Sequence, residues 1–104
     1  MVLTVEVLSA ETAWDIIDAA IRAGRHNGLK SLTVAVLDAG GHLLAFKRED
    51  GSSILREHIA RGKAFGALGL GMDSEALQGI AAARPAFMSA VFAASGGRVV
   101  PVPG

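Results

Sequence analysis

Apolar and polar residues alternate along the first quarter of the chain with the spacing of an amphipathic helix. Apolar and small residues recur every three or four positions, and charged residues occupy the opposite face. The inward positions are Ala13, Trp14, Ile17, Ala20, Ile21 and Gly24. We expect the helix to begin at Ala10 with Ser9 as its cap, and to end at Asn27-Gly28, which both tolerate left-handed backbone.

A strand-turn-strand pattern follows this helix. Residues 32–37 are apolar or β-branched throughout, which is typical of a strand buried on both faces. Residues 38–41, Asp-Ala-Gly-Gly, have turn chemistry, and residues 42–48 form the expected returning strand. The pattern predicts an antiparallel hairpin.

The second half of the chain reads as helices separated by glycines. Ser52 or Ser53 is placed to cap a helix, which glycines at 66, 69 and 71 are expected to break into a loop. A short helix from residue 73 or 74 to about residue 80 and another opening at Pro85 should follow. Residues 98–104 contain two prolines, which predicts an edge strand or a strand end.

This order of elements favours an α+β fold in which helices cover an antiparallel sheet. A βαβ nucleotide-binding fold would need strands that alternate with helices, which the pattern lacks. The 104 residues suffice for one hydrophobic core, so we expect a single domain over residues 1–104.

Composition narrows the function classes. Ten basic and ten acidic residues balance, so the basic excess that nucleic-acid binding requires is missing. No apolar run approaches the roughly 20 residues that cross a bilayer, and no secretory signal is evident, so we expect a cytoplasmic protein with no membrane partner. The absence of cysteine excludes disulfides and thiolate chemistry.

The hairpin segment Leu-Thr-Val-Ala-Val-Leu-Asp-Ala-Gly-Gly-His-Leu-Leu-Ala-Phe-Lys-Arg-Glu-Asp-Gly, residues 32–51, resembles the hallmark segment of the GlcG/HbpS family, which also forms the C-terminal domain of PduO-type proteins. The Lys63-Ala64 pair and the segment Gly-Gly-Arg-Val-Val-Pro, residues 96–101, are also similar to that family. The resemblance covers nearly the whole chain.

The resemblance implies a profilin-like sandwich, a homo-oligomer and haem as a candidate cofactor. Family members usually continue past the position of Gly104 with a further glycine-rich hairpin, which this sequence lacks. The hairpin at residues 32–48 should therefore sit in a small sheet with an exposed apolar edge, which another chain could pair with in a dimer or larger assembly.

His58 is the candidate histidine of the sequence. It lies on the apolar side of the second predicted helix, in line with Ile54 and Gly62. There it could act as a haem axial ligand or as a general base, or it could be a structural histidine at the margin of the core. No pair of histidines has the spacing of a metal site.

Four cations complete the candidate set. Arg56 and Lys63 share a helix stripe that could present positive charge to a haem propionate or a small organic acid. Arg98 follows a glycine turn that could form an anion nest, and Arg48 ends a strand near the next helix. The stripe of Arg56 and Lys63 could instead be a solvated helix face, and the glycine turn before Arg98 could be only a helix C-cap.

These features lead to three functional hypotheses. In the first, a pocket between the sheet and the helices binds haem or another anionic organic ligand through His58, Arg56, Lys63, Arg98 and Arg48. In the second, the protein is a metal-independent isomerase, tautomerase or lyase of small organic acids. In the third, it is an accessory subunit of an oligomer.

Overall fold

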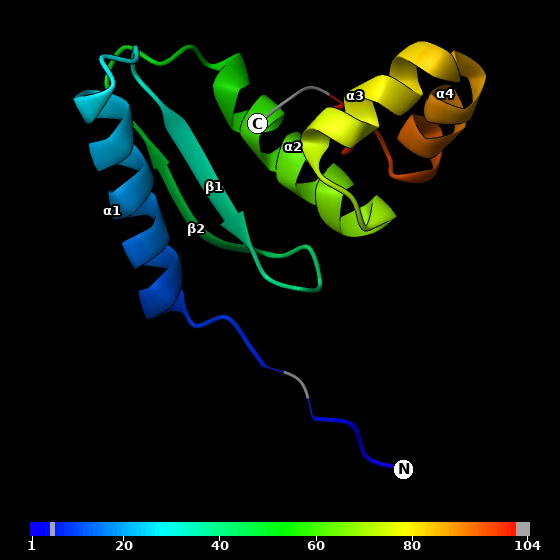
Figure 1. Cartoon of the computed structure of the whole chain (residues 1–104), viewed down its shortest axis with the longest axis horizontal. Coiled ribbons are helices and arrows are strands. Elements are labelled where there is room, and N and C mark those ends of the chain that lie inside the picture. The colour runs from blue at the N-terminus through cyan, green and yellow to red at the C-terminus, as the bar shows by residue number, and fades with distance from the viewer. Residues whose placement is uncertain (5, 102–104) are drawn as a thin grey trace.

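The computed structural model describes residues 1–4 and 6–101. Six elements follow one another: α1 (Ala10–His26), β1 (Thr33–Leu37), β2 (Leu43–Arg48), α2 (Leu55–Leu70), α3 (Ser74–Ala83) and α4 (Pro85–Ala94). In Figure 1 the hairpin of β1 and β2 lies between α1 and α2, and α3 and α4 lie beyond α2. The predicted α+β class is confirmed, and the wider profilin-like sandwich stays a prediction.

α1 forms where the apolar pattern places it. The Ser9 hydroxyl accepts the Thr12 N–H at 3.1 Å, and Asn27 caps the other end. Ala13, Ile17, Ile21 and Gly24 form the buried face. Trp14 does not belong to that face, because 45% of its surface is exposed. The buried stripe is therefore narrower than the sequence suggests.

The hairpin is antiparallel, as predicted. Thr33 pairs with Arg48 at its open end, and a register shift between Val36 and Leu37 leads into the turn. α1 packs on the face of the sheet that carries Val34 and Val36. α2 packs against β1 as well, and all five residues of β1 are half-buried.

α2 differs from the expectation at both ends. Neither Ser52 nor Ser53 caps it with a side chain, and Ile54 occupies the cap position. The Ser52 hydroxyl is instead 2.8 Å from that of Thr33, which ties the loop to β1. The helix also continues through Gly66 and Gly69 to Leu70, and Gly71, whose φ of 65° is left-handed, caps its end. Leu77 and Val99 pack directly against Gly66, and this close packing offsets the weak helix propensity of glycine.

The last two helices begin as predicted, with Asp73 as the cap of α3 and Pro85 in the first turn of α4. The segment after α4 runs back along α2, where the Val100 N–H donates to the Gly62 carbonyl at 3.1 Å. The predicted terminal strand is absent from residues 98–101, and its remainder, residues 102–104, lies outside the described residues.

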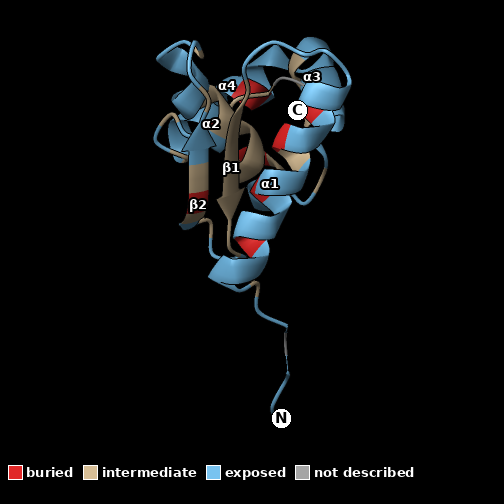
Figure 2. Cartoon of the chain, turned by 90° about the vertical axis from the view of Figure 1, so that its left-hand side faces the viewer, coloured by how far each residue is buried: buried red, intermediate tan, exposed pale blue. Residues whose placement is uncertain are grey.

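The apolar residues gather in two separate clusters. Ala13, Ile17, Ile21 and Ala45 form the first, between α1 and the sheet. Leu77, Met88 and Val99 form the second, among the helices of the other half. Figure 2 shows that buried positions are few and that much of each helix is exposed. α2 lies between the two clusters.

Candidate functional site

A pocket of about 290 Å³ opens between α2, the turn of the hairpin and the segment that follows α4. Its lining combines apolar and charged side chains: Leu37, Gly41, Ile54, Glu57, His58, Arg61, Gly62, Phe65 and Arg98. We call this the turn pocket. Its volume is close to the lower end of the range for small-molecule sites, roughly 300–1,000 Å³.

Helical spacing explains the α2 wall of the turn pocket. Ile54, His58, Gly62 and Phe65 lie three or four residues apart, so they share one side of the helix. Gly62 allows the returning segment to lie close, because a Cβ there would be 2.8 Å from the Arg98 carbonyl oxygen. The pocket therefore depends on a close approach that only glycine permits.

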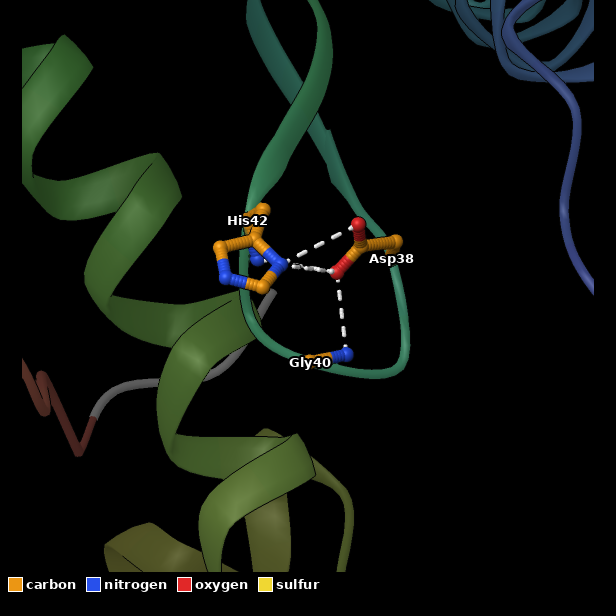
Figure 3. A network of polar contacts seen from close by, with 3 residues as sticks. All are labelled: Asp38, Gly40 and His42. Atoms are coloured by element: carbon orange, nitrogen blue, oxygen red, sulfur yellow. Dashed lines mark hydrogen bonds and ion pairs between the residues drawn. The ribbon is translucent and has the colours of Figure 1, made fainter.

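The hairpin turn forms the rim of the pocket and is held by Asp38 (Figure 3). One carboxylate oxygen of Asp38 accepts the N–H groups of Gly40 at 2.9 Å and of His42 at 3.0 Å, and it lies 3.1 Å from the His42 Nδ1. The N–H of His42 is the main cause that lowers the pKa of Asp38. Gly41, with a φ of 82°, then brings the turn against the Phe65 ring.

Arg98 is the best-positioned cation of the turn pocket. Its guanidinium carbon lies 4.2 Å from the centre of the Phe65 ring, and its Nε donates to the Ser95 carbonyl at 2.7 Å. Within the described chain its two terminal nitrogens have no hydrogen-bond partner. A guanidinium held on an aromatic ring with those donors free is suited to a carboxylate.

Arg61 and Glu57 also border the turn pocket. They lie one helical turn apart at 3.7 Å and are about half exposed, at 49% and 55%. An exposed pair of this kind is worth little, so Arg61 is readily available to a ligand. Arg61 and Arg98 against Glu57 leave the charged lining of the pocket with a net positive charge.

His58 lies in the same pocket and is exposed. Across residues 1–4 and 6–101, its ring takes part in no hydrogen bond or ion pair. A buried structural histidine would have a partner, which argues against that interpretation. The imidazole nitrogens are therefore available to a ligand in the pocket.

The predicted cations do not all lie together. His58 and Arg98 line the turn pocket, whereas Arg56 and Lys63 line a groove on the opposite side of α2. Arg48 ends β2 and lines neither space. The helix rotates by about 100° per residue, so Arg56 and His58 point in different directions although they are near in sequence.

Three contributors to the turn pocket do not follow from the sequence pattern. Arg61 and Glu57 look like an ordinary surface pair, and Phe65 looks like a core residue. The available signal is that Arg61 follows His58 by three residues and thus shares its side of the helix. The approach of Arg98 to Phe65 has no signal in the sequence, because it is a contact between distant segments.

In the part of the chain that the structure describes, no three histidine, aspartate or glutamate residues are grouped to hold a metal ion. No helix among those residues is long and apolar enough to cross a membrane.

Comparison with known proteins assigns a family. A family model described as haem degrading protein HbpS-like matches residues 8–104, which is nearly the whole chain. No curated protein and no solved structure matches the chain. The family model therefore supplies both the family and its relation to haem, which holds at the family level.

Proposed function

We propose that this chain, which belongs to the HbpS-like family, binds an anionic organic ligand in the turn pocket, with haem as the first candidate. The observation that carries the proposal is the Arg98 guanidinium, which is held over Phe65 at 4.2 Å with His58 and Arg61 beside it. Its terminal donors have no hydrogen-bond partner among residues 1–4 and 6–101. Cations that border an apolar wall suit a ligand with a flat apolar body and a carboxylate.

The residues of the turn pocket fit haem in three respects. His58 offers an imidazole that has no hydrogen-bond partner among the described residues. Arg61 and Arg98 offer cations for the propionates, and Phe65 and Leu37 offer apolar contacts. At about 290 Å³ the pocket would hold a small organic acid entirely, but only part of a haem. Bound haem would supply an iron centre whose reactivity depends on its axial ligand.

Titration of the purified protein with haem, followed by the Soret band, tests the proposal. We expect the Soret band to shift, and the shift to saturate at one haem per binding site. His58→Ala should remove or move the shifted band, because the axial ligand changes. Arg98→Ala should weaken affinity about 10- to 100-fold, the usual effect of losing a charge-assisted hydrogen bond. Following the band over time with a reductant and oxygen would also report haem breakdown.

Matched controls locate the site. His26→Ala removes an exposed histidine in the last turn of α1, and Lys63→Ala removes a cation from the other side of α2. Both should leave the titration unchanged. An unshifted free-haem spectrum would exclude haem, and equal losses in Lys63→Ala and Arg98→Ala would exclude the turn pocket as the site.

A further inference from the structure

Arg98 stands at a place in the chain where a long side chain needs support to keep one position. It is exposed and follows Gly96 and Gly97, whose φ values of 68° and 78° are left-handed. Binding a ligand costs the free energy of ordering such a side chain. Two contacts already restrict it, since its Nε donates to the Ser95 carbonyl at 2.7 Å and its guanidinium carbon lies 4.2 Å from the centre of the Phe65 ring. The first contact engages only the inner nitrogen, so the terminal nitrogens depend on the ring for their position.

The Phe65 ring is itself held by its surroundings. It is half-buried and packs against the cluster of Leu77, Met88 and Val99. The hairpin turn lies along one edge of the ring, because a Cβ on Gly41 would be 3.0 Å from its Cε2 and 3.2 Å from its Cδ2. A ring packed in this way has little freedom to move, and it is a firm support for a cation.

A second contact of the same kind gives a comparison. The Arg84 guanidinium carbon lies 4.6 Å from the centre of the Phe87 ring, near the start of α4. Neither of these residues lines the turn pocket. A cation over an aromatic ring is therefore not a binding site by itself. Arg98 differs because it lines a pocket together with a second cation, Arg61, and an apolar wall.

The turn pocket suits one class of ligand in size and in chemistry. Its volume of about 290 Å³ suffices for a small molecule and not for a large cofactor. Leu37 and Ile54 offer contacts to a flat apolar body, whereas Arg61 and Arg98 offer donors to a carboxylate. A small aromatic acid has both parts.

We propose that the turn pocket binds a small aromatic carboxylic acid, and that Phe65 is the positioning residue for its recognition because the ring holds the Arg98 guanidinium. The inference rests on the proposed function and names its ligand class. The ring face attracts the cation electrostatically, and a guanidinium already in place loses less freedom when a carboxylate binds. An uncharged amide of the same shape gains much less. Phe65 should therefore set the preference for acid over amide.

Binding of 2-naphthoate and of its amide, 2-naphthamide, to the full chain tests this role. The ratio of the two dissociation constants, measured by fluorescence titration, reports carboxylate recognition. We expect the wild type to prefer the acid at least about tenfold, and Arg98→Ala to lose most of this preference. Phe65→Leu should lower the ratio about two- to fivefold, the usual strength of an exposed contact between a cation and a ring. Phe65→Tyr keeps a ring and should restore the ratio.

A measurement without ligand separates positioning from packing. Protons of the Arg98 side chain that lie over an aromatic ring are shifted upfield in the proton NMR spectrum. We expect this shift in the wild type and in Phe65→Tyr, and its loss in Phe65→Leu. Phe87→Leu is the matched control, because it removes a contact of the same kind outside the turn pocket. It should leave both the ratio and the Arg98 shifts unchanged.

Four results would overturn the inference: unshifted Arg98 protons in the wild type, equal binding of acid and amide by the wild type, an undiminished preference in Phe65→Leu, or an equal loss in Phe87→Leu. The first two use the wild type alone, so they decide the inference even where Phe65→Leu does not fold. The haem titration keeps the proposed function separate. A Soret shift that depends on Arg98 would leave that function standing when this inference fails.

Discussion

Two glycines of α2 differ in their surroundings although they occupy the same helix. A Cβ on Gly62 would clash with Val100 and lie 2.8 Å from the Arg98 carbonyl oxygen. A Cβ on Gly69 would meet nothing within 4 Å. Gly62 is therefore required by packing, and Gly69 only weakens the helix.

Alanine substitutions at these two positions should act in opposite directions. Gly62→Ala should lower the free energy of unfolding by about 1–3 kcal/mol, because it overpacks a close contact. Gly69→Ala should raise it by about 0.5–1 kcal/mol, the difference in helix propensity. Urea unfolding measures both values, and a stabilised Gly62→Ala variant would contradict the close approach.

Asp38 makes the stability of the hairpin depend on acid. Its pKa in the folded chain lies below the ordinary value of 3.8, mainly because the His42 N–H donates to the carboxylate. The ionised carboxylate thus stabilises the fold above about pH 4, and this contribution is lost as the pH falls through the folded pKa.

We expect the carbon-13 shift of the Asp38 carboxyl group to titrate with a midpoint below 3.8. Asp38→Asn should lower stability near pH 7 and flatten its decline between about pH 4 and pH 2. Thermal unfolding across that range measures the slope, and a slope equal to that of the wild type would contradict this role.

Among the helices, α3 has a side-chain cap at its start and α2 has none. The Asp73 carboxylate accepts the Ala76 N–H at 2.8 Å. Asp73→Ala should therefore cost about 1 kcal/mol of stability in urea unfolding, and Asp73→Asn should cost much less because it keeps the cap. Equal losses in the two variants would show that the cap is not the cause.

The elements that sequence predicts well are those whose signals are local. Ser9, Asp73 and Pro85 mark helix starts through bonds or backbone geometry within one turn, and the turn at Asp38 closes within four residues. The errors concern contacts between distant segments. Ser52 bonds to Thr33 rather than capping α2, which a local pattern cannot reveal.

The same distinction applies to the candidate site. His58 and Arg98 were both expected to bind ligand, and the structure places them in one pocket. The sequence predicts that the helix stripe of Arg56 and Lys63 lines the same pocket, yet the rotation of α2 directs these two residues to the groove on its opposite side. Which of these residues bind a ligand stays a prediction.

At the scale of the whole molecule, the two apolar clusters share no buried residue. Ile17 belongs to the first and Leu77 to the second, and both are fully buried. Their substitutions should therefore act independently.

Ile17→Val and Leu77→Val should each lower the free energy of unfolding by about 1 kcal/mol. The double variant should show the sum within about 0.5 kcal/mol, because residues of separate clusters are not coupled. Urea unfolding of the four proteins completes the cycle. A larger coupling energy would mean that the clusters form one continuous core.

The position of α2 between the turn pocket and the groove on its opposite side has a consequence for genetic experiments. Substitutions on the His58 side and on the Lys63 side belong to different stripes of one helix. In a complete mutational scan of α2 scored for ligand retention, the loss should oscillate with a period of about 3.6 residues and peak on the His58 side.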